Sequence, residues 1–426
     1  MTLLIRNGTI IDPSQKLKKK SDIVLDRGKI VGLGKIKAKK SWHIVDASGC
    51  FVVPGFIDTH VHLCEPGRED KETILTGSEA AAAGGFTSVV CMPDSEPVND
   101  NEAITDFILQ RARRVGLVNV FPAGAITKGL LGEELAEVGE MVKAGIVAIT
   151  DDPNPVENNQ VMRRACEYAK TFDIPVIDHC GELSLAAQGH MNEGAVSTHL
   201  GLRGISRAAE EMDITRDIIL SRITGVRLHL AHVSTQESLS WVRQAKNQDI
   251  QVTCGVTPHH FTLTDSDIRD YHTDFKVDPP LRTQEDVQAI VEGIVDGTID
   301  CIATDHFPQT RLEKETTFDE AAPGIIGMET AISLCWDFLI CRAGLSPTRL
   351  VELFSTNPNR ILQLDRGTLK EGAIADVTII DPDCEVTVDA SKFKSKSRNC
   401  PFDRWKLRGS VVMTIVKGRI IYQQGC

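Results

Sequence analysis

The 426-residue sequence lacks several features that would assign it to a common class of protein. It has no run of about 18 apolar residues that could cross a membrane, and its apolar N-terminal run is too short for a signal peptide. Neither Gly-x-Gly-x-x-Gly nor Gly-x-x-x-x-Gly-Lys-Ser/Thr follows a strand-like run, so a nucleotide-binding fold has no support. These absences predict a soluble, cytoplasmic protein without a nucleotide-binding domain.

An excess of basic charge and closely paired cysteines are also missing. The 47 basic and 59 acidic side chains give a formal charge of −12, which argues against a surface that binds nucleic acid or an anionic membrane. The 12 cysteines show no Cys-x-x-Cys spacing, and we interpret them as reduced, mostly buried thiols. The 42% apolar and 25% charged fractions are typical of a globular protein.

The central part of the sequence alternates strand-like and helix-like segments. The predicted strands are residues 56–63, 87–92, 118–125, 145–150, 175–179, 226–233, 251–256 and 301–304. The predicted helices include residues 80–83, 102–115, 133–143, 159–171, 207–222, 236–246 and 285–295. Eight alternations over about 300 residues favour a closed (β/α)8 barrel over an open doubly wound sheet, so we expect an α/β fold.

Both ends of the chain contain short β-type runs separated by turns such as Asn7-Gly8. The first end is expected to form an antiparallel sheet, and neither end is large enough to bury much surface alone. We therefore expect them to meet in one small composite β-sandwich beside the barrel. The predicted boundaries are 1–53 and 365–426 for the two parts of the sandwich and 54–364 for the catalytic barrel.

Two histidines in the first predicted barrel strand are the most informative feature. His60 and His62 are two positions apart, so their side chains point to the same face and could reach one metal. One His-x-His is a weak signal, because strand histidines are usually packed or hydrogen-bonded. Further ligand-type residues follow at the ends of later strands, where barrel enzymes carry their reactive groups: Asp152, His179, His232 and Asp305.

The six residues predict a metal-dependent hydrolase; the alternative is a set of unrelated core histidines and capping aspartates. Imidazole and carboxylate ligands without thiolates suit a zinc-like ion. Six ligands exceed what one tetrahedral metal takes, so we expect two metals that share the carboxylate of Asp152. Such a pair can lower the pKa of a water molecule, and Asp305 could serve as general base and acid.

The sequence also resembles the class I dihydroorotases, a family of cyclic amidohydrolases. The resemblance covers nearly the whole chain and includes residues 54–62, 65–67, 84–88, 91–93, 150–152, 201–205, 209–211, 229–234, 303–306 and 327–330. It implies the reversible hydrolysis of dihydroorotate to N-carbamoyl-L-aspartate in pyrimidine biosynthesis, with two zinc ions per chain and a homodimer. It further implies that Asp305 is both metal ligand and proton shuttle. Of the neighbouring aspartates, we place the bridge at Asp152, with Asp151 as the alternative.

Four positions depart from the family pattern, and by the resemblance all of them concern the substrate. The family's Arg, Asn, Asn and His are replaced by Cys64, Asp94, Asp278 and Gln309. A cysteine cannot replace the bidentate, charge-assisted contact of an arginine with a carboxylate, and two ionised aspartates would repel an anion. None of the four changes removes a predicted metal ligand.

Three functions are compatible with this pattern. The first is a dihydroorotase that anchors its substrate through other groups, such as Arg282, Arg68 or the backbone of Pro323 and Gly324. The second is an amidohydrolase for a cyclic amide that lacks the carboxylate or carries positive charge. The third is a non-catalytic partner of aspartate transcarbamoylase, against which the intact metal ligands argue. The polar segment 310–322 would be either a lid or an exposed loop.

Overall fold

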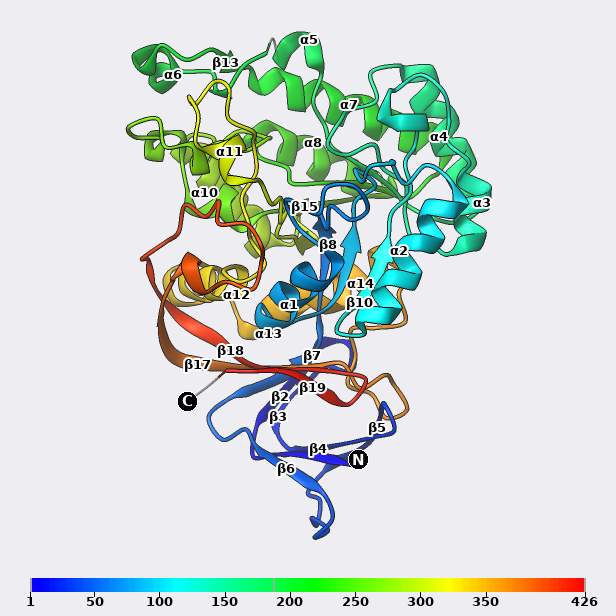
Figure 1. Cartoon of the computed structure of the whole chain (residues 1–426), viewed down its shortest axis with the longest axis vertical. Coiled ribbons are helices and arrows are strands. Elements are labelled where there is room, and N and C mark those ends of the chain that lie inside the picture. Colours follow the sequence, from blue (N-terminus) through cyan, green and yellow to red (C-terminus); the bar gives the residue numbers. More distant parts are fainter. Residues whose placement is uncertain (1, 187, 425–426) are drawn as a thin grey trace.

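The computed structural model describes residues 2–186 and 188–424. Figure 1 shows a barrel of strands surrounded by helices, with two sheets below it that contain the first and last strands of the chain. Within the described ranges, none of the helices combines the length and apolar character needed to cross a bilayer.

The barrel strands are parallel and follow one another around the ring. One sheet contains β8 (Phe56–Val61), β9 (Phe86–Cys91) and β10 (Asn119–Pro122). A second contains β11 (Val176–Asp178), β14 (Leu228–Leu230), β15 (Val252–Val256) and β16 (Cys301–Ile302). Bridges from Ile149 to Gly124 and Val176 join the two sheets, and the bridge between Val61 and His306 closes the ring. The predicted barrel is thereby confirmed.

The predicted strand at 145–150 is wrong as an extended strand. Only Ile149 forms bridges there: Gly145 still caps α3 (Val138–Ala144), and beyond Thr150, which hydrogen-bonds with Gly124 and Ile126, the chain turns between Asp151 and Asn154. Its hydrogen bonds nevertheless continue the ring, since the Ile149 N–H donates to Pro175 (3.2 Å) and its carbonyl accepts from Ile177 (2.9 Å). The turn therefore begins at the edge of the barrel where the reactive residues were expected.

A buried carboxylate joins the first and last barrel strands. Asp58 accepts hydrogen bonds from the backbone N–H of Thr304 (3.0 Å) and from its hydroxyl (2.5 Å). Since Asp58 precedes His60 and Thr304 precedes Asp305, this contact fixes the relative position of two predicted site residues.

The helices cover the outside of the barrel (Figure 1). Asparagines cap two of them, as the preference for asparagine at helix N-termini predicts: Asn101 for α2 (Glu102–Val115) and Asn158 for α4 (Asn159–Thr171). The other α-helices are α1 (Ile74–Ala83), α3 (Val138–Ala144), α5 (Leu183–Ala186), α6 (Ala195–Leu200), α7 (Arg207–Thr224), α8 (Gln236–Asn247), α9 (Pro258–Thr262), α10 (Gln284–Asp296), α11 (Arg311–Lys314), α12 (Ala331–Cys335), α13 (Pro347–Val351) and α14 (Asn357–Leu362).

Both chain ends contribute to the sheets beside the barrel. The first sheet has the order β5 (Lys29–Gly34), β4 (Asp22–Asp26), β1 (Leu3–Arg6), β6 (His43–Asp46). The second has the order β19 (Arg419–Gln423), β18 (Lys406–Val416), β17 (Val377–Thr387), β7 (Phe51–Pro54), β2 (Thr9–Asp12), β3 (Leu17–Lys20). One apolar cluster containing Leu3, Ile10 and Val377 lies between them. The sheets are mixed rather than antiparallel, because β1 pairs with β6 and β2 with β7 in parallel.

A glycine in β18 lies against a barrel helix. Gly409 has a φ of +84°, and a Cβ atom there would stand 2.3 Å from Cγ of the buried Trp336. We expect Gly409→Ala to lower the free energy of unfolding, through the left-handed backbone and an overpacking cost of about 1–3 kcal/mol. Gly372→Ala is the matched control, since Gly372 has a φ of +87° and open space around the added Cβ. Equal losses of thermal midpoint in the two variants would contradict the close contact with Trp336.

Candidate metal centre

The carboxylate of Asp152 lies between two pairs of histidines. Its Oδ1 is 3.1 Å from Nε2 of His60 and 3.4 Å from Nε2 of His62. Its Oδ2 is 3.5 Å from Nδ1 of His179 and 3.6 Å from Nε2 of His232. One oxygen thus faces the histidines of the first strand, and the other faces those that follow β11 and β14.

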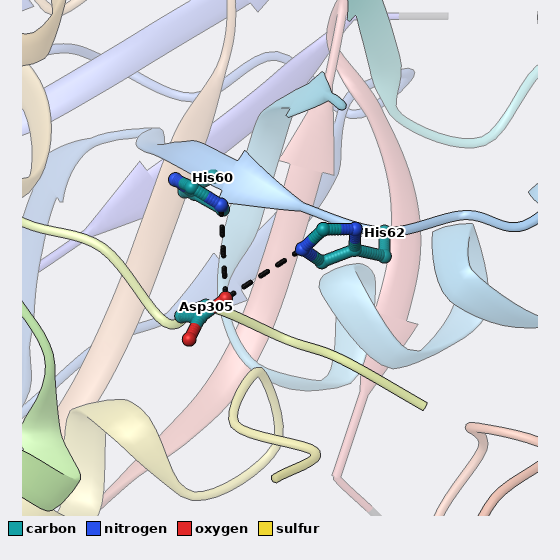
Figure 2. Close-up of side chains that lie close together, drawn as sticks. All are labelled: His60, His62 and Asp305. Atoms are coloured by element: carbon teal, nitrogen blue, oxygen red, sulfur yellow. Dashed lines mark ion pairs between the residues drawn. The ribbon is translucent and has the colours of Figure 1, made fainter. Parts of the chain in front are cut away.

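Asp305 completes the group on the side of the first strand. Figure 2 shows its carboxylate pointing toward both His60 and His62; its Oδ1 lies 3.7 Å and 3.6 Å from their Nε2 atoms. On the other side, Nδ1 of His179 and Nε2 of His232 are 3.1 Å apart. The structure therefore brings all six predicted ligands together, and all six are buried.

The donor atoms of this cluster fit divalent metal ions. The ligand atoms of His60, His62 and Asp305 lie within 4.8 Å of one another, as do those of His60, Asp152 and His232. Nε2 of His60 and Oδ1 of Asp152 are buried and form no well-aligned hydrogen bond with any residue that the structure describes. Such atoms are costly to bury unless a partner satisfies them, and a metal ion would do so.

Asp151 has a different environment from its neighbour. Its carboxylate accepts hydrogen bonds from the backbone N–H (2.8 Å) and the hydroxyl of Thr127. Both of its oxygens are thereby engaged with the loop after β10, whereas both oxygens of Asp152 face histidines. This difference favours Asp152 as the shared carboxylate.

A further acidic group lies beside the cluster and has its own counter-ion. Asp178, Cys180 and Asp217 are close enough to hold a metal. However, the guanidinium of Arg216 lies 3.2 Å from Asp178 and 2.8 Å from Asp217. We therefore interpret this group as a buried ion-pair network.

The charges of the cluster shift the pKa values of its members. Burial alone would lower the pKa of His62, but Asp94 and the neighbouring carboxylates outweigh it and raise that pKa to about 10. Burial is likewise outweighed at His179, whose pKa is raised to about 9 by Asp152 and Asp278. Asp305 shows the opposite balance: burial raises its pKa, but the contact with His62 and the charge of His60 bring it below the usual range.

Two side chains lie directly against the ring of His62. Oδ2 of Asp94 is 2.8 Å from Nδ1 of His62, on the side of the ring away from Asp152 and Asp305. Phe307 stacks on the same ring, with the centroids 3.8 Å apart and the planes 14° apart. A carboxylate behind a histidine is a common way to fix the orientation of a metal-binding imidazole. Asp94 therefore contacts a predicted ligand directly.

A cavity of about 340 Å³ opens over the cluster. Four of the residues expected to contact the substrate line it: Asp278, Gln309, Pro323 and Gly324. The side chain of Asp278 is about half exposed, with Oδ2 3.8 Å from Nε2 of His179. In the described part of the chain, Cys64 and Asp94 are not among the lining residues.

The structure adds residues that sequence reasoning did not find. Lys71, Asn154 and Phe307 also line the cavity. Lys71 lies in the charged segment between β8 and α1, and loops that follow barrel strands lie on the catalytic face. The position of Lys71 in that loop could have indicated a role in the site. However, a charged segment of this kind is equally typical of a solvent-exposed loop.

The two arginines expected as alternative anchors are engaged elsewhere. Arg282 is buried and donates to Ser234 (2.9 Å) and Glu210 (3.4 Å). Arg68 donates to Glu313 (3.1 Å). In the described ranges neither arginine lines the cavity.

Comparisons with known proteins agree with this geometry. Residues 49–238 match the family model described as dihydro-orotase-like. The chain is 50% identical over 425 residues to the dihydroorotase of Geobacter metallireducens, covering 100% of both chains. It is 48% identical to that of Acetivibrio thermocellus, covering 99% of both. The fold matches an L-hydantoinase from Arthrobacter aurescens, with a TM-score of 0.89, 24% identity and coverage of 100% of this chain and 96% of that one.

A whole-length identity of one half, together with a buried histidine and aspartate cluster, identifies this chain as a member of the dihydroorotase family of metal-dependent cyclic amide hydrolases.

Proposed function

We propose that this cluster is a binuclear zinc centre that interconverts dihydroorotate and N-carbamoyl-L-aspartate in the cytoplasm. The observation that carries the proposal is the division of the two Asp152 oxygens between two pairs of histidines. We assign His60, His62 and Asp305 to one metal, His179 and His232 to the other, and Asp152 to both. When bound, the metals would supply a Lewis acid for the ring carbonyl and acidify a water molecule.

Asp305 is the residue that we assign to proton transfer. Its lowered pKa keeps the carboxylate ionised at neutral pH, so it can accept a proton from the attacking water. The water oxygen adds to the ring carbonyl, the C–N bond breaks, and Asp305 returns the proton to the departing nitrogen. Asp94 and Phe307 support this step by holding His62 in one orientation.

Replacement of Asp305 tests this assignment. We expect Asp305→Ala to lower kcat for dihydroorotate by at least about 10²–10⁴-fold, the usual contribution of a general acid or base. Circular dichroism and the thermal midpoint should show a folded protein, and zinc analysis should separate loss of metal from loss of proton transfer. Full activity in a folded Asp305→Ala variant would remove this residue from the mechanism.

Zinc uptake should depend on pH through the histidines. The raised pKa values of His62 and His179, about 10 and 9, mean that both rings carry protons in the metal-free protein at pH 7. A metal ion must displace these protons, so zinc affinity should rise with pH toward 9–10 and fall as the solution becomes acidic.

Calorimetric titration of metal-free protein with zinc, in buffers of different ionisation enthalpy, measures this proton release directly. We expect an observed enthalpy that changes with the buffer at pH 7 and changes less near pH 10. A buffer-independent enthalpy at pH 7 would show that the rings are already neutral in the metal-free protein.

We also propose that the chain forms a homodimer, as the resemblance to class I dihydroorotases implies. Light scattering should then give about twice the chain mass of 46.7 kDa. A monomer that enters a larger complex only when aspartate transcarbamoylase is added would instead favour a hetero-oligomer.

A further inference from the structure

An anionic substrate needs a cation in the cavity, and the altered positions do not provide one. Cys64 carries no positive charge, and its Sγ points to the carbonyl of His62 at 3.8 Å. Asp94 is engaged with His62, and Asp278 is a carboxylate at the cavity wall. The remaining altered position, Gln309, is neutral. The carboxylate of the substrate must therefore be held by a different residue.

Lys71 is the cationic side chain that faces this space. It is only 7% exposed, and among the described residues it is the one lysine or arginine that lines the cavity. Burying an ammonium group is costly unless polar partners compensate for the lost water. Lys71 has two such partners: Nζ lies 2.6 Å from Oε1 of Gln309 and 2.9 Å from Oε1 of Glu313.

Gln309 fixes the direction of this ammonium group. Its Oε1 accepts from Lys71, and its Nε2 donates to the carbonyl of Pro323 at 2.7 Å. Both ends of the amide are therefore engaged with protein groups. Gln309 thus serves to orient Lys71 and to fix the cavity wall at Pro323.

The ammonium group keeps capacity for a ligand. It has three N–H donors, of which Gln309 and Glu313 take two within the described part of the chain. Glu313 is shared with Arg68, which lies 3.1 Å from the same oxygen and also pairs with the exposed Asp70 at 3.7 Å. Because Glu313 interacts with two cations, it only partly neutralises Lys71.

Lys71 also lies near the position where the family has its arginine. Burial holds the pKa of the Cys64 thiol well above its usual range, and the nearby charge of Lys71 opposes that rise. Cys64 is neutral, so no second cation at that position competes with Lys71 for an anion.

We propose that Lys71 binds the carboxylate of the dihydroorotate ring and replaces the anchoring arginine that this chain lacks. The inference rests on the proposed function, since it presumes an anionic ring substrate. It assigns a specificity-determining role to Lys71, which is not one of the six predicted metal ligands. It also makes Gln309 a positioning residue.

The test compares zinc-loaded wild-type protein with Lys71→Met. We expect KM for dihydroorotate to rise by about ten- to a hundredfold, the usual cost of losing a charge-assisted hydrogen bond, with a smaller change in kcat. Calorimetric binding of dihydroorotate should weaken by the same factor. Unchanged KM and unchanged binding in Lys71→Met would overturn the proposal.

Two further variants separate substrate binding from a structural role. Lys276→Met is the matched control, because Lys276 is 8% exposed and its Nζ donates to the Asp319 carbonyl at 2.8 Å; its KM should match the wild type. Glu313→Gln removes the ion pair but keeps Lys71, so KM should stay the same or fall. If Glu313→Gln raises KM as much as Lys71→Met, Lys71 only anchors α11 and the proposal fails.

A double variant returns a positive charge at the position where the family has its arginine. Cys64→Arg in the Lys71→Met background should lower KM again, which would support a shared binding space. The proposed function is judged separately: wild-type protein that binds dihydroorotate through Lys71 without turning it over would contradict the reaction and support the anchor. Wild-type protein that does not bind dihydroorotate at all would overturn both.

Discussion

The balance of charge around Asp152 is the constraint on which the site depends. Four imidazoles and two carboxylates are buried together where the barrel strands end, and unpaired charges are very costly in such surroundings. The neighbouring carboxylates raise the pKa of His62, which favours a proton on this ring when no metal is bound. Divalent ions would supply positive charge in place of such protons and satisfy more ligand atoms. Either protons or metal ions can therefore compensate the buried carboxylates, and pH should shift the balance between the two.

The barrel explains why the predicted ligands could be found from the sequence. Each of His60, His179 and His232 lies at or just after a short apolar strand, and parallel strands in a ring place such positions at one end. The period of two that aligns His60 with His62 is a local property of an extended chain. These features depend on residues close in sequence, so local patterns were sufficient to predict them.

The rest of the site depends on contacts between distant segments, which a single sequence does not contain. Asp151 and Asp152 are adjacent and chemically identical, and only the position of Thr127 shows which of them faces the histidines. The contact between Asp94 and the His62 ring could likewise not be predicted from the sequence. The strand predicted at 145–150 is wrong for a related reason: its apolar pattern begins at Gly145, which instead caps α3, and only Ile149 forms bridges to neighbouring segments.

The altered positions have different physical meanings once their contacts are known. Asp94 lies against the imidazole of His62, so its negative charge would support a predicted metal ligand and need not repel the substrate. Gln309 joins Lys71 to the cavity wall at Pro323, which links the loop after the first strand to the loop after the last. An arginine binds a carboxylate through a rigid fork, whereas a lysine is a flexible point charge that needs its direction set by neighbours. The two replacements at Cys64 and Gln309 therefore fit together. Lys71 would carry the charge that the family's arginine provides, and the Gln309 amide would orient it.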